Sequence, residues 1–293
     1  MTKPFVIAHR GASGYRPENT LEAFALGIDQ GADGLEFDLV ATKDRHLVIR
    51  HENALSDTTN VAELKQFESL KRKGVVDGDE VEDWFTEDFN LSQIKQLRAR
   101  ERLADLRPGS AKFDGQFGIP TFQEVLEASF ITDKKLVVEL KRGSHVSAIS
   151  KSVGEIAAKN IFDSNVLERN VELIIESFDL DLVKSAKQAI ESLGLKTKYF
   201  LALEKTKLKS IDLVELSKIV DGIAISMKML FKNQKWVDSA HEAGLVIWAY
   251  TARVEKAETT IEAYYEKIIQ TGVDGIFADQ PDLLRRVLND RGQ

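Results

Sequence analysis

The stretch FVIAHRGASGYRPENTLEAFALGIDQGADGLEFDLV, residues 5–40, decides the fold. It contains an apolar run at 5–10, an amphipathic run at 20–31 and a second apolar run at 34–40. The two apolar runs have the length and composition of buried strands, whereas the middle run has the apolar spacing of a helix. A strand, a helix and a second strand in so short a stretch predict a βαβ unit with parallel strands.

The same alternation continues to the end of the chain. Further helical patterns occupy 121–130, 147–160, 181–194, 213–220, 235–244, 261–272 and 281–290. Further strand patterns occupy 47–51, 135–141, 171–178, 198–203, 222–227, 245–251 and 275–279. If 47–51 is an extension of the strand at 34–40, the chain has eight strands and eight helices. That number predicts an α/β fold of the TIM (β/α)8 barrel type, for which about 250 residues is typical.

Residues that start and end helices support this division. Asn19 with Glu22, and Thr121 with Glu124, have the spacing of a capping box. Helical patterns are followed by glycine, as expected of helix C-caps, at 31, 194, 244 and 272.

Residues 52–118 interrupt the alternation. This stretch is long, polar and mixed in pattern, and within it LSQIKQLRARERL at 91–103 has helical spacing. Loops longer than about 15 residues usually carry function or structure of their own. We therefore expect one barrel domain spanning 1–293, with 52–118 as a small inserted subdomain after the second strand that packs over one end of the barrel.

The composition excludes several classes of function. The 293 residues carry a formal net charge of −7, whereas a general nucleic-acid binder usually has a basic excess. With no cysteine, the chain forms neither a disulfide nor a thiolate-ligated zinc or iron–sulfur site. We expect no transmembrane helix, because no apolar run approaches about 18 residues, and the N-terminus lacks the order of a signal peptide. The sequence as written therefore suggests a cytoplasmic protein, or a periplasmic or secreted one if a signal peptide has been removed.

Carboxylates gather at the predicted strand ends, where the active site of such a barrel lies. Glu36 and Asp38 are two residues apart on the second strand, so their side chains share a face, and Glu139 lies at the end of the third strand. If the three converge inside the mouth of the barrel, their repulsion would raise their pKa values and a divalent cation would relieve it. Oxygen ligands favour Ca²⁺ or Mg²⁺ over zinc.

Histidines and cationic side chains occupy the same predicted level. His9 and Arg10 end the first strand, His51 ends the extension of the second, and Lys141 follows the third acidic residue. Two histidines suit one general base and one general acid, while Arg10 and Lys141 could hold an anionic oxygen. Together with a metal ion, this set suits phosphoryl chemistry. Taken alone, His9 and Arg10 would equally suit a structural pair that binds loop carbonyls.

Other strand-end residues leave alternatives open. Trp248 and Tyr250 suit either the core or a wall of the substrate site. Glu176 suits either the mouth or an ordinary strand end, and we favour the second. Three more histidines fall in loop or helix-surface contexts and receive no chemical role: His46, His145 and His241.

The order of these motifs resembles the glycerophosphodiester phosphodiesterase family, specifically its bacterial members with a long insertion, over nearly the whole chain. HRGASGYRPENTLEAF at 9–24 resembles the family's opening signature. Later blocks of the family are resembled by GADGLEFDLVATKD at 31–44, LVIRHE at 47–52, FGIPTFQEVL at 117–126, VVELK at 137–141, GLVIWAYTAR at 244–253 and GVDGIFADQPDLL at 272–284. The chain departs from the family at Glu52, because an aspartate commonly follows the second histidine.

The resemblance implies a hydrolase that converts a glycerophosphodiester to sn-glycerol 3-phosphate and an alcohol. It implies one divalent cation bound by Glu36, Asp38 and Glu139. Ca²⁺ is favoured because members with a long insertion look like the calcium-using bacterial ones, with Mg²⁺ as the alternative.

The resemblance also implies roles for the remaining strand-end residues. His9 and His51 would form the acid–base pair, and Arg10 and Lys141 would contact the phosphate. The implied path is attack on phosphorus by the substrate's own neighbouring hydroxyl, followed by opening of the cyclic phosphate by water. The sequence does not decide which histidine acts first as the base.

Two other functions stay open at this point. A phospholipase of a related barrel group would need an apolar mouth, whereas the inserted stretch is polar apart from Trp84 and Phe85. A non-catalytic barrel that binds a phosphorylated ligand or a partner protein would usually have lost a catalytic histidine or a metal-site acid, and here all are present. We expect a small-molecule glycerophosphodiester as the partner, no nucleic acid, and a monomer or a homodimer.

Overall fold

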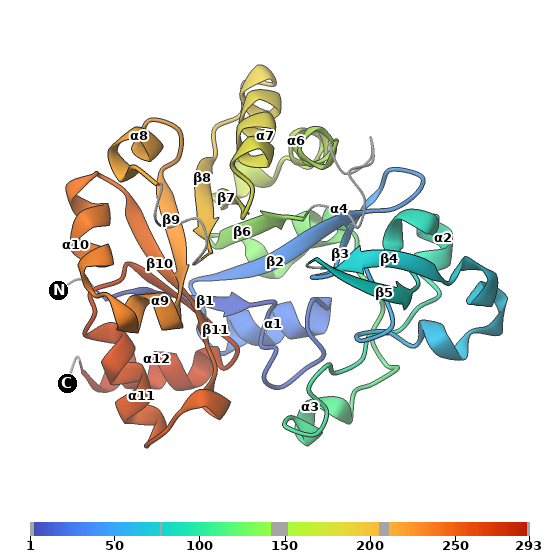
Figure 1. Ribbon diagram of the computed structural model, residues 1–293, viewed down its shortest axis with the longest axis horizontal. Helices are drawn as coiled ribbons and strands as arrows, with labels where there is room; N and C mark the ends of the chain where they lie inside the picture. The colour runs from blue at the N-terminus through green and yellow to red at the C-terminus, as the bar shows by residue number, and fades with distance from the viewer. Residues whose placement is uncertain (1–2, 77, 142–151, 205–210, 292–293) are drawn as a thin grey trace.

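A closed barrel of eight parallel strands forms the centre of the structure, a computed structural model that describes residues 3–76, 78–141, 152–204 and 211–291 (Figure 1). The strands are β1 (Phe5–His9), β2 (Gly34–Ala41), β6 (Lys135–Leu140), β7 (Glu172–Ser177), β8 (Lys198–Leu203), β9 (Gly222–Ser226), β10 (Val246–Ala252) and β11 (Gly275–Ala278). The sheet closes because β1 pairs with β2 on one side and with β11 on the other. The predicted TIM barrel is confirmed.

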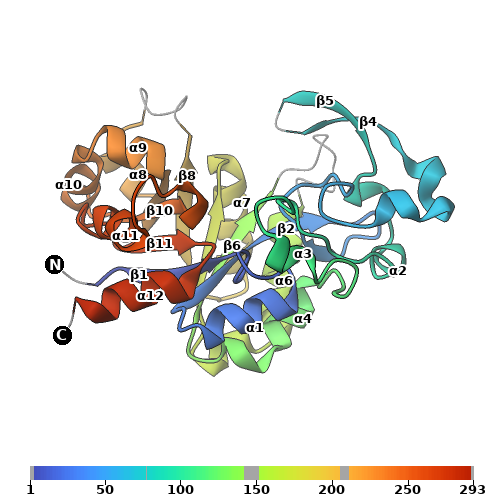
Figure 2. The same cartoon turned by 90° about the horizontal axis from the view of Figure 1, so that it is seen from below.

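Helices surround this barrel on the outside (Figures 1 and 2). They are α1 (Leu21–Asp29), α4 (Phe122–Glu127), α6 (Val153–Asp163), α7 (Leu180–Ser192), α8 (Leu213–Ser217), α10 (Lys235–Glu242), α11 (Ile261–Ile269) and α12 (Pro281–Asp290). Each corresponds to a predicted helix, although part of the one predicted at 147–160 lies outside the described residues. A further short helix, α9 (Met227–Lys232), begins where Ser226 caps it and was not predicted.

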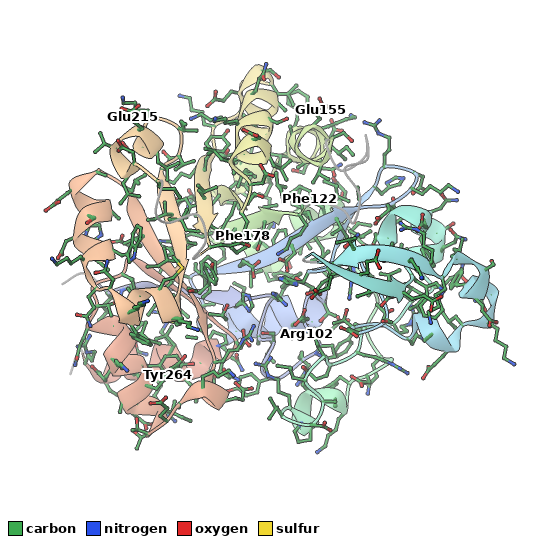
Figure 3. All side chains as sticks on the ribbon, in the orientation of Figure 1. Arg102, Phe122, Glu155, Phe178, Glu215 and Tyr264 are labelled. Atoms are coloured by element: carbon green, nitrogen blue, oxygen red, sulfur yellow. The ribbon has the colours of Figure 1, made fainter. Side chains whose placement is uncertain are left out.

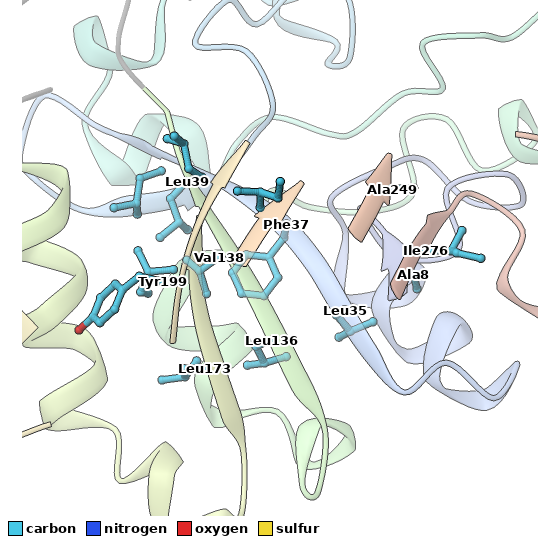
Figure 4. Close-up of a cluster of buried hydrophobic side chains, with 14 of the residues drawn as sticks. Ala8, Leu35, Phe37, Leu39, Leu136, Val138, Leu173, Tyr199, Ala249 and Ile276 are labelled. Atoms are coloured by element: carbon cyan, nitrogen blue, oxygen red, sulfur yellow. The ribbon is translucent and has the colours of Figure 1, made fainter. Parts of the chain in front are cut away.

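The alternation of side chains along each strand divides the core into two layers. Inward-facing residues fill the barrel interior: Ile7, Val137, Ile174, Phe200, Ala202, Ala224, Trp248 and Phe277. Outward-facing residues, among them Leu35, Phe37, Leu136 and Val138, pack in the layer between strands and helices (Figure 4). Both faces of every barrel strand are covered. An inward-facing charged side chain at the carboxyl end of a strand can therefore only face the mouth.

The start of α1 differs from its prediction. Thr20, not Asn19, caps the helix, because its side-chain oxygen accepts a hydrogen bond from the backbone N–H of Ala23. Asn19 adopts a left-handed backbone conformation with φ of 59°, and its side chain donates to Asp38 instead. The second predicted capping box, at Thr121 and Glu124, is confirmed.

The segment at 47–51 is not an extension of the second strand. β3 (Leu47–Ile49) runs antiparallel to β2, with Leu39 opposite Ile49 and Val40 opposite Val48. Two strands with the same local pattern form a hairpin here because the chain reverses at Thr42–Arg45, where Arg45 has φ of 65°. The reversal brings the chain back to the mouth, where the Arg50 N–H donates to the Asp38 carbonyl at 2.9 Å.

The inserted segment, residues 52–118, lies beside the barrel on the side away from α10, α11 and α12 (Figures 1 and 2). It contains β4 (Arg72–Val76), β5 (Asp79–Asp83), α2 (Leu91–Ile94), α3 (Pro108–Ala111) and 3-10 turns at Val61–Glu63, Lys65–Leu70 and Thr86–Asp88. It carries much of a second hydrophobic cluster that includes Phe67, Trp84 and Phe89. Trp84 and Phe85 are therefore buried rather than presented to a lipid surface.

The helix predicted at 91–103 is wrong beyond its first turn. α2 ends at Ile94, and the chain then forms isolated bridges from Arg98 to Gly118 and from Ala99 to Thr59. Burial of Leu97 and Ala99 in the second cluster outweighs the helical spacing of this stretch.

The close approach of β2 to β6 gives a test of this packing. A Cβ at Gly34 would lie 2.3 Å from the Lys135 carbonyl oxygen. We expect Gly34→Ala to lower the free energy of unfolding by about 2 kcal/mol, the scale of overpacking in a core. Thermal and denaturant melts would measure the change. Gly118→Ala is the matched control, because a Cβ there meets no atom within 4 Å, and an equal loss in both variants would contradict this explanation.

Candidate active site

Three carboxylates converge at the mouth of the barrel, as predicted. Glu36, Asp38 and Glu139 each offer an oxygen, and these oxygens lie within 4.8 Å of one another. The register of β2 and β6 places Asp38 directly beside Glu139. All three side chains are buried, with Asp38 fully inaccessible to solvent.

Two cationic side chains, Lys141 and Arg10, flank these three carboxylates, which together form the acidic group. Lys141 Nζ lies 3.1 Å from Asp38 Oδ1 and 2.5 Å from Glu139 Oε1. Arg10 Nε lies 3.5 Å from Asp38 Oδ2, and the Arg10 N–H donates to Glu36 Oε2 at 3.0 Å. Arg10 has φ of 55°, so the chain turns sharply after β1 and its side chain is directed back over the carboxylates.

The carboxylates respond unequally to this environment. Burial, together with the charge of Asp38, raises the pKa of Glu36 well above its ordinary value. The pKa of Glu139 is also raised, mainly by burial. Burial opposes ionisation of Asp38 too, but Lys141, His51 and Arg10 hold its pKa well below the ordinary value.

The acidic group fits a hard divalent cation. Its donors are all carboxylate oxygens, which is the ligand type that Ca²⁺ and Mg²⁺ prefer. Lys141 and Arg10 do not fully neutralise the three buried carboxylates, since the pKa values of Glu36 and Glu139 remain raised. A cation bound by Glu36, Asp38 and Glu139 would remove that repulsion.

His9 is held by a carboxylate that the sequence analysis did not select. Its Nδ1 lies 2.7 Å from Asp279 Oδ1, and its Nε2 lies 3.9 Å from Glu36 Oε2 and 3.4 Å from Thr251 Oγ1. Because a carboxylate accepts at Nδ1, Nε2 is left as the basic ring nitrogen. Burial, with the charge of Arg10, lowers the pKa of His9 to about 4, so the ring is neutral at neutral pH.

His51, which is close enough to Asp38 and Glu139 to lower their pKa values, is also paired with a carboxylate. Its Nδ1 contacts Glu52 Oε1, so Nε2 is again the ring nitrogen that is not bound to the carboxylate. Burial would raise the pKa of Glu52, but the hydrogen bond and charge of His51 hold it below its ordinary value. Glu52, which had no clear role in the sequence, therefore orients a histidine.

The two predicted aromatic residues are separated by the structure. Tyr250 is at the mouth, where its hydroxyl donates to the Leu203 carbonyl and its ring meets Phe178 edge-on at 5.7 Å. Trp248 is not at the mouth. It is 2% exposed and packs in the barrel interior against Phe200 at 5.0 Å, and against Phe5 at the start of β1 at 6.4 Å.

Glu176 also faces the mouth rather than an ordinary strand end. It is buried, is paired in register with Glu139, and its Oε2 has no hydrogen-bond partner among the described residues. It lies outside the group of three that could hold a metal. Of the other histidines, His46 is exposed, His241 pairs with Asp274 on the surface, and His145 lies outside the described residues.

Two further acidic residues were missed by the sequence analysis. Asp279 directly follows β11, so the rule that selected Glu36 and Glu139 could have found it. Glu18 lies in the loop before α1 and binds Arg10 Nη1 at 2.8 Å. No strand-end rule could identify Glu18, because its position depends on the path of that loop.

One mouth of the barrel thus brings together three buried carboxylates, two cationic side chains and two histidines that are each paired with a carboxylate. Residues 9–283 match the model of the Glycerophosphoryl diester phosphodiesterase family. The chain belongs to this family, as the sequence motifs had suggested.

Two glycerophosphodiester phosphodiesterases are similar to the chain in sequence over nearly its whole length. A glycerophosphodiester phosphodiesterase of Caldanaerobacter subterraneus subsp. tengcongensis is 29% identical over 292 residues, covering 99% of this chain and 100% of the relative. A glycerophosphodiester phosphodiesterase of Bacillus subtilis is 26% identical, covering 96% of this chain and 85% of the relative.

Solved structures share the fold. A phosphodiesterase of Oleispira antarctica, in complex with the product sn-glycerol-3-phosphate, superposes with a TM-score of 0.69 at 23% identity and covers 98% of this chain and 97% of its own. A glycerophosphodiester phosphodiesterase of Thermotoga maritima superposes with a TM-score of 0.62 at 24% identity, covering 98% and 99%.

Cation binding by the acidic group is directly testable. We expect CaCl2 or MgCl2 to raise the melting temperature of the protein, because a ligand at 100 times its Kd adds about 2.7 kcal/mol of stability. Glu36→Gln should abolish most of that rise while keeping the acceptor for the Arg10 N–H. Calorimetric titration would give the affinity for each cation.

Glu176→Gln is the matched control for this measurement. It changes a buried mouth carboxylate outside the group of three, so the cation-induced rise should persist. If the wild-type protein shows no rise with either cation, or if Glu36→Gln shows the full rise, the acidic group is not the cation site.

Proposed function

We propose that the protein hydrolyses glycerophosphodiesters to sn-glycerol 3-phosphate and an alcohol, with His9 and His51 as the acid–base pair. The observation that carries this proposal is the convergence at one mouth of two carboxylate-oriented histidines, two cations and a buried acidic group. Membership of the family supports the reaction class, and the product complex of the Oleispira antarctica protein supports the product.

Arg10 and Lys141 are the residues that would hold the phosphodiester. Burial would lower the pKa of each, but the neighbouring carboxylates raise it above the ordinary value, so both stay charged across the working pH range. Arg10 offers a planar set of donors and Lys141 a compact charge, which together can bind the non-bridging oxygens of a phosphate. The rings of Tyr250 and Phe178 contact each other edge-on, and the Phe178 ring lies next to Lys141.

Glu36, Asp38 and Glu139 would hold the divalent cation. When bound there, it supplies positive charge to an oxygen nucleophile and to the phosphate oxygens.

The proposed first step forms a cyclic phosphate. The hydroxyl of the glycerol unit next to the ester attacks phosphorus, and the bond from phosphorus to the alcohol oxygen breaks. One histidine accepts the hydroxyl proton at Nε2, and the other donates a proton to the departing alcohol oxygen. The proton count balances because one imidazole gains what the other loses.

The proposed second step reverses these roles. A water molecule attacks the cyclic phosphate and gives its proton to the histidine that was deprotonated in the first step. The other histidine returns its proton to the ring oxygen that leaves phosphorus. The result is sn-glycerol 3-phosphate, and both histidines return to their starting states.

The burial of the apolar pair in the inserted segment bears on the phospholipase alternative. Trp84 and Phe85, the apolar pair named from the sequence, belong to a core. In the described part of the inserted segment, the exposed large apolar side chains are Val75 and Leu106. These are two single residues rather than a patch. Among the described residues, no helix has the length and apolar character to cross a membrane. Because Trp84 and Phe85 are buried rather than presented to a lipid surface, we propose a small soluble diester as the substrate.

The activity is tested by incubation with glycerophosphocholine and a coupled assay for sn-glycerol 3-phosphate. We expect product release that EDTA abolishes and that added Ca²⁺ or Mg²⁺ restores, because the acidic group needs a cation. Phospholipid vesicles serve as the comparison substrate. Activity confined to vesicles would favour the phospholipase, and activity unaffected by EDTA would reject the metal site.

The two histidines are tested separately. We expect His9→Ala and His51→Ala each to lower kcat by at least about 100-fold, the usual scale of general acid–base catalysis. His241→Ala is the matched control, because that histidine pairs with Asp274 on the outer surface and should keep the wild-type rate. A retained kcat in the His9 or His51 variant would refute the role of that residue.

A further inference from the structure

We propose that the inserted segment holds His9 and Arg10 in their working positions through two arginines, Arg107 and Arg102. This inference rests on the proposed function, in which His9 transfers a proton and Arg10 binds phosphate. It assigns the two arginines as positioning residues, since each acts through an intermediate carboxylate rather than through the substrate.

The first connection runs from Arg107 through Asp279 to His9. Arg107 Nη2 pairs with Asp279 Oδ2, while the other oxygen of that carboxylate, Oδ1, binds His9 Nδ1 at 2.7 Å. The Arg107 side chain is 3% exposed, so it lies out of reach of a substrate. Removing it would leave Asp279 with Arg253, whose Nε lies 3.0 Å from Oδ2.

Arg107 also supports the backbone of the first motif. Its Nη1 donates to the Ser13 carbonyl at 3.0 Å, and the Ser13 hydroxyl donates to the His9 carbonyl at 2.8 Å. His9 is therefore connected to the same guanidinium through its ring and through its main chain. A third contact, from Arg107 Nε to Glu255 Oε1 at 2.6 Å, fixes the plane of the guanidinium.

The inserted segment holds Arg107 firmly. Arg107 immediately precedes α3, and its own N–H donates to the Leu103 carbonyl at 2.8 Å. Glu101 closes the same turn, because it accepts from the Leu103 N–H at 2.8 Å and from the Ser110 hydroxyl at 2.6 Å. The guanidinium thus projects from a structured turn and fixes Asp279 relative to the inserted segment.

The second connection runs from Arg102 through Glu18 to Arg10. Arg102 Nη2 lies 3.3 Å from Glu18 Oε2, and Arg10 Nη1 donates to Glu18 Oε1 at 2.8 Å. Figure 3 shows Arg102 in the region between α1 and the β4–β5 hairpin. Burial would raise the pKa of Glu18, but the two arginines lower it to about 2, so the carboxylate stays ionised and both pairs persist.

The two connections predict different kinetic effects. The first fixes a proton-transfer group, and a misplacement of about 1 Å at such a group can reduce the rate by about 100-fold. Arg107→Met should therefore lower kcat by about 10- to 100-fold with little change in KM. The second fixes a phosphate-binding group, so Arg102→Met should raise KM several-fold while kcat stays within about 3-fold.

The experiment measures kcat and KM on glycerophosphocholine, together with the melting temperature, for the wild type, Arg107→Met, Arg107→Lys and Arg102→Met. Arg107→Lys keeps the charge but cannot contact Asp279, Glu255 and Ser13 together, so its kcat should lie between those of Arg107→Met and the wild type. If Arg107→Met does not fold, Arg107→Lys decides. A reduced kcat at an unchanged melting temperature supports the inference, and a wild-type kcat contradicts it.

Arg100→Met is the matched control, because Arg100 is an arginine of the same segment that pairs with Glu63, itself a residue of that segment. It should keep the wild-type kcat and KM. An equal loss in Arg100→Met and Arg107→Met, or the absence of the split between kcat and KM, would overturn the inference.

His9→Ala in the same assay distinguishes a failure of the proposed function from a failure of the positioning role of Arg107 and Arg102. A wild-type protein without activity, or an active His9→Ala, removes the proposed function and with it this inference. An active wild type with an inactive His9→Ala, but with unaltered Arg107 and Arg102 variants, removes the inference alone.

Discussion

Like charge buried at the mouth of the barrel is the constraint on which the rest of the site depends. Three carboxylates within 4.8 Å of one another cannot all ionise in a buried space without compensation. Arg10 and Lys141 supply part of it, and their own positions are then fixed by the carboxylates that they neutralise. Asn19 donates to Asp38 and Thr20 caps α1, so even the start of this helix is arranged around the buried charge.

Much of the fold could be predicted because its signals are local. The alternation of inward and outward residues along β2 and β6 identifies both the strands and the faces that carry Glu36, Asp38 and Glu139. The hairpin of β2 and β3 could not be distinguished from one longer strand, since the side-chain pattern of the two is the same. The false helix after Ile94 has a different cause, because long-range bridges and burial there override local spacing.

The site was less predictable where partners are distant in sequence. Asp279 lies 270 residues from His9, and only closure of the barrel brings them together. Trp248 fits the strand-end pattern but faces the interior, since sequence spacing gives the face of a residue and not its depth along the barrel. Arg102 and Arg107 sit in a segment whose placement depends on its own core, so no pattern in the sequence relates them to the mouth.

The hydrogen bond between His9 and Asp279 joins the first strand of the barrel to the residue after the last. During synthesis, His9 leaves the ribosome well before Asp279, which lies 270 residues further along the chain, so it has no orienting carboxylate until β11 has followed. Orientation of His9 therefore requires the last strand of the barrel. A product truncated before β11 would keep most of the residues of the mouth, including His51 and Glu52, and still lack the carboxylate that orients His9. The orientation of the His9 ring thus depends on closure of the barrel, because its partner Asp279 follows the strand that closes the sheet against β1.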